Sequence, residues 1–264
     1  MSTRVTVLGC GGSLAVPLIG NDWGACDPAE PRNRRTRPSI MIEQGENVLV
    51  IDTGPDFYEQ ANRCNIKRID AVVYTHYHSD HVLGMDDLRG WCRRRNIEMP
   101  VYATDETFDE LKSRFGYLLV ANPKNEALYP IVLKTHTLTA DQLYQPIEIG
   151  GVRVTLFEQD HGSCTSLGVR IGNFAYSTDM LRLPEPSIRV LKGVENWLVD
   201  GAAYNNPETV HAGLSTVYEL NREIGAKNVY ITHMPLYMDY QTLINELPPG
   251  YAPAYDGLTF DVTA

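Results

Sequence analysis

A buried strand that ends in a cluster of imidazole and carboxylate groups is the feature that most restricts how this chain can fold. The apolar run Ala71–Tyr74 is typical of such a strand, and it is followed at once by His76, His78, Asp80 and His81. Neither core packing nor solubility explains why four such groups occur together. Open α/β sheets place their sites at the carboxyl ends of strands, and zinc, manganese and iron all accept imidazole and carboxylate ligands. The pattern predicts a metal site at a sheet edge.

Three more candidate ligands lie far along the chain, each just past an apolar segment. His161 follows the segment that ends at Asp160, Asp179 follows Phe174–Thr178, and His233 follows Val229–Thr232. This repetition of the first arrangement strengthens the prediction of a metal site.

The order of apolar runs predicts an α+β fold in which two mixed sheets pack together with helices outside. Hairpin-turn glycines at Gly150-Gly151 and Gly172-Asn173 indicate consecutive hairpins over Glu148–Ser177. No internal repeat or linker is visible, so we expect one domain over residues 1–264. The predicted helices are Pro55–Asn62, Asp105–Phe115 and Leu214–Ile224. The predicted strands are Arg4–Leu8, Ser39–Glu43, Val48–Ile51, Ala71–Tyr74, Val152–Phe157, Leu167–Ile171 and Asn228–Ile231.

Charge and cysteine usage restrict the partners and the compartment. The chain has 23 Lys and Arg against 33 Asp and Glu, a formal net charge of −10, which argues against binding long nucleic acid. Its 5 cysteines are scattered and form no CxxC pair, as expected of reduced thiols in the cytoplasm. The apolar run at the N-terminus is too short for a signal peptide and no apolar run is long enough to span a membrane, so we expect a cytoplasmic protein without membrane contact.

With these residues in place, the chain resembles the metallo-β-lactamase fold superfamily over nearly its whole length. The resemblance implies a four-layer αβ/βα sandwich with a dinuclear site. It further implies two divalent metal ions per chain, with Zn²⁺ the first expectation and Mn²⁺ the second. By motif match, Asp179 bridges the two metals. The ligands are His76, His78 and His161 for one metal, and Asp80, His81 and His233 for the other. True zinc β-lactamases use a Cys-containing set in the second position, so antibiotic hydrolysis is disfavoured.

A sixth histidine places the resemblance more narrowly. His211 lies in Val210–Thr216 and is similar to the histidine motif of the phosphodiesterase branch, which includes tRNase Z and the phosphoribosyl 1,2-cyclic phosphate phosphodiesterases. The second group is the closer match, through Leu8–Ser13 with Val16-Pro17 and through Tyr255-Asp256-Gly257. In this branch His211 would act as a general acid and Asp80 would both bind metal and orient the nucleophile. The loop Gly20–Asp27 has a single cysteine, so no structural zinc is expected, and the tRNA-gripping arm has no counterpart.

The remaining candidates have plainer alternatives. The resemblance makes Asp52 a residue that orients the ligand loop, as metal-binding histidines require, and it would also serve as a cap for the helix Pro55–Asn62. Asp256-Gly257 is expected to make a hairpin turn. His136 is expected to be structural or on the surface. Arg is suited to phosphate, so Arg34 and Arg35, together with Ser215, are candidate substrate contacts, although such a run is usually a solvated face.

These features predict a dinuclear metal-dependent phosphodiesterase acting on a small cyclic phosphate, nucleotide or sugar phosphodiester. The leading alternative is a thioester or lactone hydrolase of the glyoxalase II type. A tRNA 3′-processing nuclease and a non-catalytic metal-binding protein are further alternatives. The expected partner is a small-molecule phosphodiester, and a homodimer is compatible with the sequence.

Overall fold

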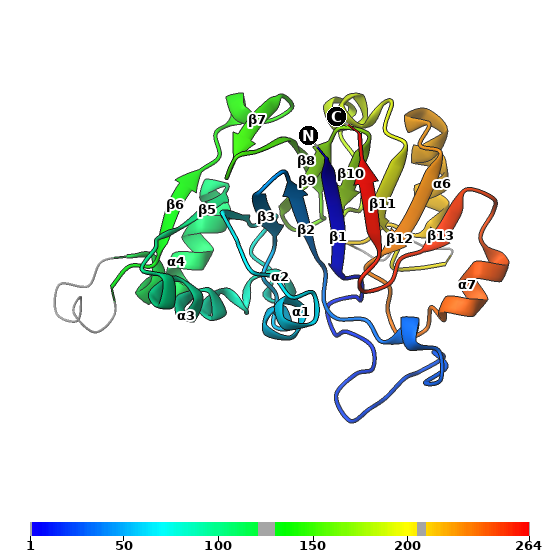
Figure 1. Ribbon diagram of the computed structural model, residues 1–264. Helices are drawn as coiled ribbons and strands as arrows, with labels where there is room; N and C mark the ends of the chain where they lie inside the picture. The colour runs from blue at the N-terminus through cyan, green and yellow to red at the C-terminus, as the bar shows by residue number, and fades with distance from the viewer. Residues whose placement is uncertain (1, 121–129, 205–209, 264) are drawn as a thin grey trace.

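The computed structural model describes residues 2–120, 130–204 and 210–263. Two mixed sheets face each other, each with seven strands among these residues, and helices flank them on the outside (Figure 1). The predicted αβ/βα sandwich of two mixed sheets is therefore confirmed.

The first sheet contains strands from the first half of the chain and one from its end. Its central strands β1, β2 and β3 pair antiparallel, β14 joins β1 antiparallel, and β4, β5 and β6 continue in parallel from β3. The strands, in sheet order, are β14 (Thr259–Val262), β1 (Thr3–Gly9), β2 (Ser39–Gln44), β3 (Asn47–Ile51), β4 (Ala71–Val73), β5 (Met99–Ala103) and β6 (Leu133–Thr137).

The second sheet repeats this plan with the later strands. An antiparallel half, β7 to β10, is followed by parallel pairs from β10 to β13. The strands, in sheet order, are β13 (Tyr251–Pro253), β12 (Asn228–Thr232), β11 (Asn196–Asp200), β10 (Phe174–Ser177), β9 (Thr165–Ile171), β8 (Val152–Asp160) and β7 (Pro146–Ile149).

Helices cover the outer faces and connect the parallel strands. The α-helices are α1 (Phe57–Arg63), α2 (Ser79–Val82), α3 (Met85–Arg95), α4 (Asp105–Leu119), α5 (Glu185–Leu191), α6 (Leu214–Ile224) and α7 (Tyr240–Glu246). Short 3₁₀ helices lie at Pro31–Asn33 and Ala140–Gln142. No helix of the described segments is both long enough and apolar enough to cross a bilayer.

Burial on both faces explains why the central strands are apolar throughout. In β3, Leu49 and Ile51 lie in the core between the sheets, whereas Val48 and Val50 face the helix-side core with Phe108. Alternate side chains of a strand point to opposite faces, and a strand covered on both faces must be apolar at every position. Such strands can be recognised in the sequence as continuous runs.

The described elements confirm most of the predicted ones and correct one turn. Both glycine hairpins are present, as β7–β8 and β9–β10, and α6 covers Leu214–Ile224 as predicted. Asp256-Gly257 does not form a hairpin, because β13 and β14 belong to different sheets. The buried Asp256 carboxylate instead accepts hydrogen bonds from the backbone of Cys10 (3.0 Å) and Thr36 (2.9 Å) and pairs with Arg63 (3.2 Å). It therefore joins the segment between β1 and β2 to the end of α1.

The long segment that follows β1 packs back onto the start of α7. Asp239 caps α7 by accepting from the Thr242 backbone (2.9 Å), and it also accepts from the Asn33 amide (2.6 Å) and the Asp27 backbone (3.2 Å). Partial burial raises the pKa of Asp239, but these hydrogen bonds outweigh it and lower the pKa to about 2. One carboxylate thus fixes both a helix end and the loop.

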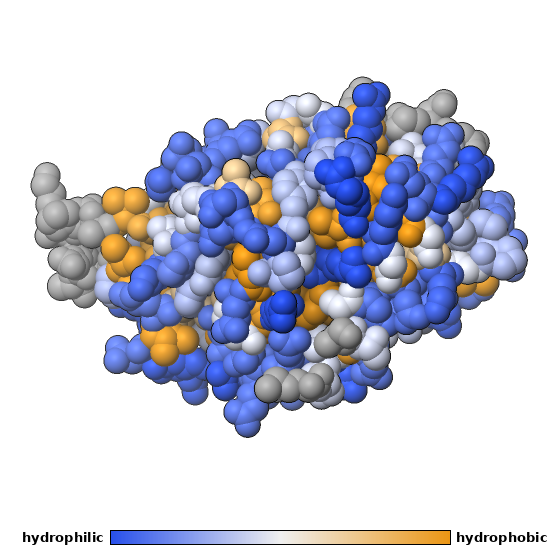
Figure 2. All heavy atoms as spheres, turned by 90° about the horizontal axis from the view of Figure 1, so that it is seen from above, coloured by the Kyte–Doolittle hydropathy of each residue, from blue (hydrophilic) through white to orange (hydrophobic). Residues whose placement is uncertain are grey.

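The end of the molecule that carries both termini is mostly hydrophilic, with apolar patches between (Figure 2).

Replacement of this carboxylate tests the anchor. We expect Asp239→Ala to lower the free energy of unfolding by roughly 1–2 kcal/mol at neutral pH, the usual cost of a lost N-cap. Because the folded-state pKa is depressed, the stabilisation is present above the ordinary pKa of 3.8 and is lost as the pH falls towards about 2. Urea unfolding at pH 7 and pH 3 measures both effects, and a difference that does not shrink at pH 3 would contradict the carboxylate's role.

Candidate metal centre

The sequence-predicted ligands meet where strands of both sheets end. His76 follows β4, His161 follows β8, Asp179 follows β10 and His233 follows β12. These strands run in the same direction within each sheet, so their carboxyl ends share an edge. The short helix α2 then supplies Asp80 and His81 from its first turns. All seven predicted metal-ligating residues are therefore brought together.

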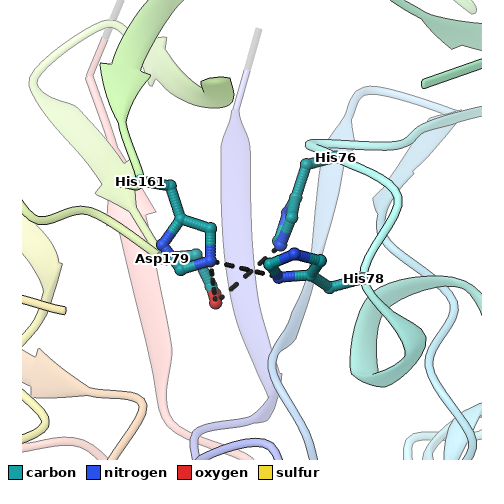
Figure 3. Close-up of side chains that lie close together, drawn as sticks. All are labelled: His76, His78, His161 and Asp179. Atoms are coloured by element: carbon teal, nitrogen blue, oxygen red, sulfur yellow. Dashed lines mark hydrogen bonds and ion pairs between the residues drawn. The ribbon is translucent and has the colours of Figure 1, made fainter. Parts of the chain in front are cut away.

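The first group consists of His76, His78, His161 and Asp179, whose side chains converge from both sheets (Figure 3). One potential ligand atom from each lies within 4.8 Å of the others. His161 Nε2 is 3.1 Å from His78 Nδ1 and 3.5 Å from Asp179 Oδ1. His76 Nε2 lies 3.9 Å from the same carboxylate oxygen.

The second group consists of Asp80, His81, Asp179 and His233, with the same 4.8 Å limit between ligand atoms. His81 Nε2 lies 2.9 Å from Asp179 Oδ2, and His233 Nε2 lies 3.4 Å from Asp179 Oδ1. Asp80 Oδ2 is 3.5 Å from His81 Nε2 and 3.6 Å from His233 Nε2. Asp179 belongs to both groups, because Oδ1 faces His76, His161 and His233 while Oδ2 faces His81.

The donor atoms fit divalent cations because several are buried without a hydrogen-bond partner. His76 Nε2, Asp80 Oδ2 and His233 Nε2 are in this state among the described residues. A buried polar atom without a partner costs about 1–3 kcal/mol, and a cation shared by these atoms would remove that cost. Imidazole with carboxylate is also the donor set that zinc accepts.

Burial determines the protonation of the imidazoles in the first group, and the carboxylates determine that of His81 in the second. Desolvation lowers the pKa of His76, His78 and His161, so these rings stay neutral, the form that binds a metal. Burial opposes charge at His81 as well, but Asp179 and Asp52 outweigh it and raise the pKa of His81 well above its ordinary value. The second group is thus rich in negative charge.

Asp52 contacts His81 and Thr75 from behind the cluster and does not cap α1. Its Oδ2 lies 2.6 Å from His81 Nδ1 and accepts from the Thr75 hydroxyl, while Oδ1 accepts from the Thr75 backbone at 2.8 Å. Asp52, Asp179 and His233 all have positive φ values, 64°, 50° and 58°. Such backbone is strained for residues other than glycine and is concentrated at functional sites.

His211 lies beside the cluster and is held by a residue that the sequence analysis missed. Its Nδ1 is 2.8 Å from Oδ2 of Asp200, the last residue of β11, and its ring stacks on His233 at 4.4 Å. Burial lowers the pKa of His211, but Asp200 outweighs it and raises the pKa to about 9. The position of Asp200 at a strand end, like the ligands, was the available signal.

The structure does not bring the candidate substrate contacts to the cluster in one group. Arg35 is only 1% exposed and donates to Asn33 Oδ1 (3.0 Å), so its guanidinium serves the loop interior and does not reach a substrate. Arg34 is exposed and lies over the Trp23 ring at 5.0 Å. Ser215 is exposed in the first turn of α6. His136 stacks on Tyr102 at 4.7 Å, away from the cluster, in the first sheet.

Fold and site together define a metal-dependent hydrolase of the metallo-β-lactamase fold. The family model for the beta-lactamase superfamily domain matches residues 47–234, and the chain belongs to this family. A solved structure described as a new diphosphatase from the PhnP family has a TM-score of 0.88 and 33% identity, and the alignment covers 100% of this chain and 99% of that one.

Curated relatives carry other names. An octanoyltransferase from Porphyromonas gingivalis is 32% identical over 97% of this chain and 51% of its own length. A ribonuclease Z from a Bradyrhizobium species is 27% identical over 52% of this chain and 44% of its own. The chain therefore spans about half the length of these two relatives.

The contact between Asp52 and His81 yields a prediction for metal affinity. In Asp52→Asn the amide oxygen can still accept from the Thr75 backbone, so the amide nitrogen then faces His81 Nδ1. Donation to Nδ1 leaves the ring proton on Nε2, the atom that faces the cluster. We expect metal affinity to fall about 10–100-fold, measured by competition with a chromogenic chelator. Asp109→Ala, on the exposed face of α4, is the control, and equal affinity in both variants would contradict the orienting role.

Proposed function

We propose that the protein is a dinuclear metal-dependent phosphodiesterase that acts on a small phosphodiester. The observation that carries this proposal is the pair of donor groups sharing Asp179, with the Asp200–His211 pair beside them. The first group would hold one Zn²⁺ through His76, His78 and His161. The second would hold another through Asp80, His81 and His233, with Mn²⁺ as the alternative metal. When bound, two such cations generate a nucleophile from water at neutral pH and neutralise charge on the phosphoryl oxygens.

His211 supplies the proton that the leaving oxygen needs. Its Nδ1 is occupied by Asp200, so Nε2 is the ring atom left to donate. Asp200 is itself fixed, because its Oδ2 also accepts from the Met180 backbone at 3.0 Å. Burial lowers the pKa of His211, but the Asp200 carboxylate outweighs it and raises the pKa to about 9, and cations held nearby would lower it again.

The presence of a proton donor, His211, also helps to distinguish the candidate reactions. A thiol has an ordinary pKa near 8.5 and leaves without help, whereas an alkoxide needs a proton. The Asp200–His211 pair therefore favours an oxygen leaving group over the thiolate that a thioester would release. The name of the PhnP-family structure supports a second candidate, hydrolysis of a diphosphate bond with the same groups. The net charge of −10 disfavours tRNA as the substrate.

Hydrolysis of a chromogenic bis-aryl phosphodiester tests the reaction class. Protein loaded with zinc or manganese is compared with the same protein after chelation, and a diphosphate ester, a thioester and a lactone are run in parallel. We expect metal-dependent turnover of the phosphodiester above that of the thioester and lactone. No turnover from protein that carries two bound metals would refute the phosphodiesterase, and turnover of the diphosphate alone would select the second candidate.

His211→Ala separates the acid from the ligands. We expect metal content to stay near that of the unchanged protein, while turnover of a phosphodiester with an alkoxide leaving group falls about 10²–10⁴-fold because the leaving oxygen loses its proton donor. His136→Ala is the matched control, since that ring lies on β6 against Tyr102. Metal content is read by atomic emission. A loss of metal from His211→Ala would instead show that His211 supports the ligands.

A further inference from the structure

A cavity of about 310 Å³ opens against His211 and His233. One wall is the segment after β1, drawn in blue below that strand in Figure 1, and the other is the segment after His233. Gly12 lies close to His233, since a Cβ added there would be 3.6 Å from the ring Nδ1. Gly12 also donates to the Met234 carbonyl at 3.1 Å, which joins the two walls.

The side chains that line this cavity are mostly apolar. Leu14, Leu18, Leu236 and the Tyr237 ring form its sides, and Leu14 is 67% exposed at the rim. The Tyr237 hydroxyl donates to the Ala202 carbonyl at 2.6 Å. Among the described residues that line it, none is Lys, Arg, Asp or Glu.

The nearby arginines are committed to other partners. Arg35 is buried and donates to Asn33 and, at 3.5 Å, to the Pro235 carbonyl on the cavity wall. Arg37 pairs with Asp56 at 2.9 Å and donates to the Ser13 carbonyl at 3.1 Å. Both cations thus bind the backbone of the wall segments from outside and do not line the cavity.

We propose that this cavity receives the leaving group of the substrate and selects an uncharged aryl or short alkyl group over one that carries a further anionic group. The inference rests on the proposed phosphodiesterase function, because His211, the proton donor, lines the cavity. Its volume is at the small end for ligand sites, so it suits a single ring or a short chain. In the step itself, the oxygen of water adds to phosphorus and one water proton passes to the solvent. The bond from phosphorus to the leaving oxygen breaks, that oxygen takes a proton from His211 Nε2, and His211 is reprotonated from the solvent.

The physical reason is the difference between burying apolar and charged surface. Each buried CH₂ is worth about 0.8 kcal/mol, or roughly fourfold in affinity. An anion that enters the same space loses its hydration without gaining a cation, which opposes binding. A substrate with an additional phosphate on its leaving group is therefore disfavoured by the same walls.

Two methyl aryl phosphodiesters test this selectivity. One has a 4-nitrophenyl leaving group and the other its ring-carboxylated analogue, and each rate is normalised to the uncatalysed alkaline rate. We expect kcat/KM to favour the neutral ring by about tenfold or more. Binding of the two free nitrophenols, followed by NMR titration, provides a second measurement that does not require turnover.

A charge placed at the rim supplies the matched variants. Leu14→Lys adds a cation at an exposed position of the cavity, and Ile244→Lys adds the same charge on the outer face of α7, where the side chain is 44% exposed. We expect Leu14→Lys to reduce the preference for the neutral ring about tenfold, and Ile244→Lys to leave it unchanged.

Each outcome decides one of the two proposals. Equal kcat/KM and equal binding for both rings, or the same ratio in both lysine variants, would overturn the cavity assignment while the phosphodiesterase stands. No turnover of either ester with the binding preference intact would refute the phosphodiesterase and retain an apolar ligand cavity.

Discussion

The carboxylate of Asp179 is the group on which the arrangement of the site depends. Oδ1 faces His76, His161 and His233, and Oδ2 faces His81 at 2.9 Å. The residue is 1% exposed, and Asp80 and Asp52 are buried nearby. Three buried carboxylates within one cluster are stable only if positive charge accompanies them. The raised pKa of His81 shows that the carboxylates attract positive charge there, and the unpartnered donor atoms are suited to cations.

The architecture explains how such distant residues meet. Each sheet has an antiparallel half and a parallel half, and the loops after β4, β8, β10 and β12 open at one edge. The apolar side chains on both faces of β3 hold this strand between two cores. They also hold the loop after it in place, so Asp52 can adopt a φ of 64°. Strain of this kind persists only where the surroundings over-determine it. The rigidity of the core thus fixes the positions of the residues at this sheet edge.

Most of the fold and of the candidate site could be predicted from the residues at strand ends, whereas contacts between individual side chains could not. The two-sheet fold and the meeting of seven candidate ligands follow from apolar runs that end in His or Asp, a signal carried by neighbouring positions. Asp200 ends the same kind of run, but its partner His211 is eleven residues away, so only the structure pairs them. The sequence at Asp256 indicates a turn, but it does not reveal that the Asp256 carboxylate contacts Cys10, Thr36 and Arg63. Arg35 lies in an arginine-rich run that suggests phosphate binding, but its side chain is buried as deeply as that of a core residue.

His233 marks the boundary between two environments with opposite chemistry. On one side its ring faces Asp179 and Asp80, where charge is concentrated, and on the other it stacks on His211 above an apolar cavity. A phosphodiester is divided in the same way, since its phosphoryl oxygens are anionic and its leaving group need not be. Under the proposed function, a site of this form would hold the charged part by electrostatics and the uncharged part by burial, with His211 at the junction. The net charge of −10 and the internal pairing of Arg35 and Arg37 agree with the proposal that a substrate is bound through metals and apolar walls.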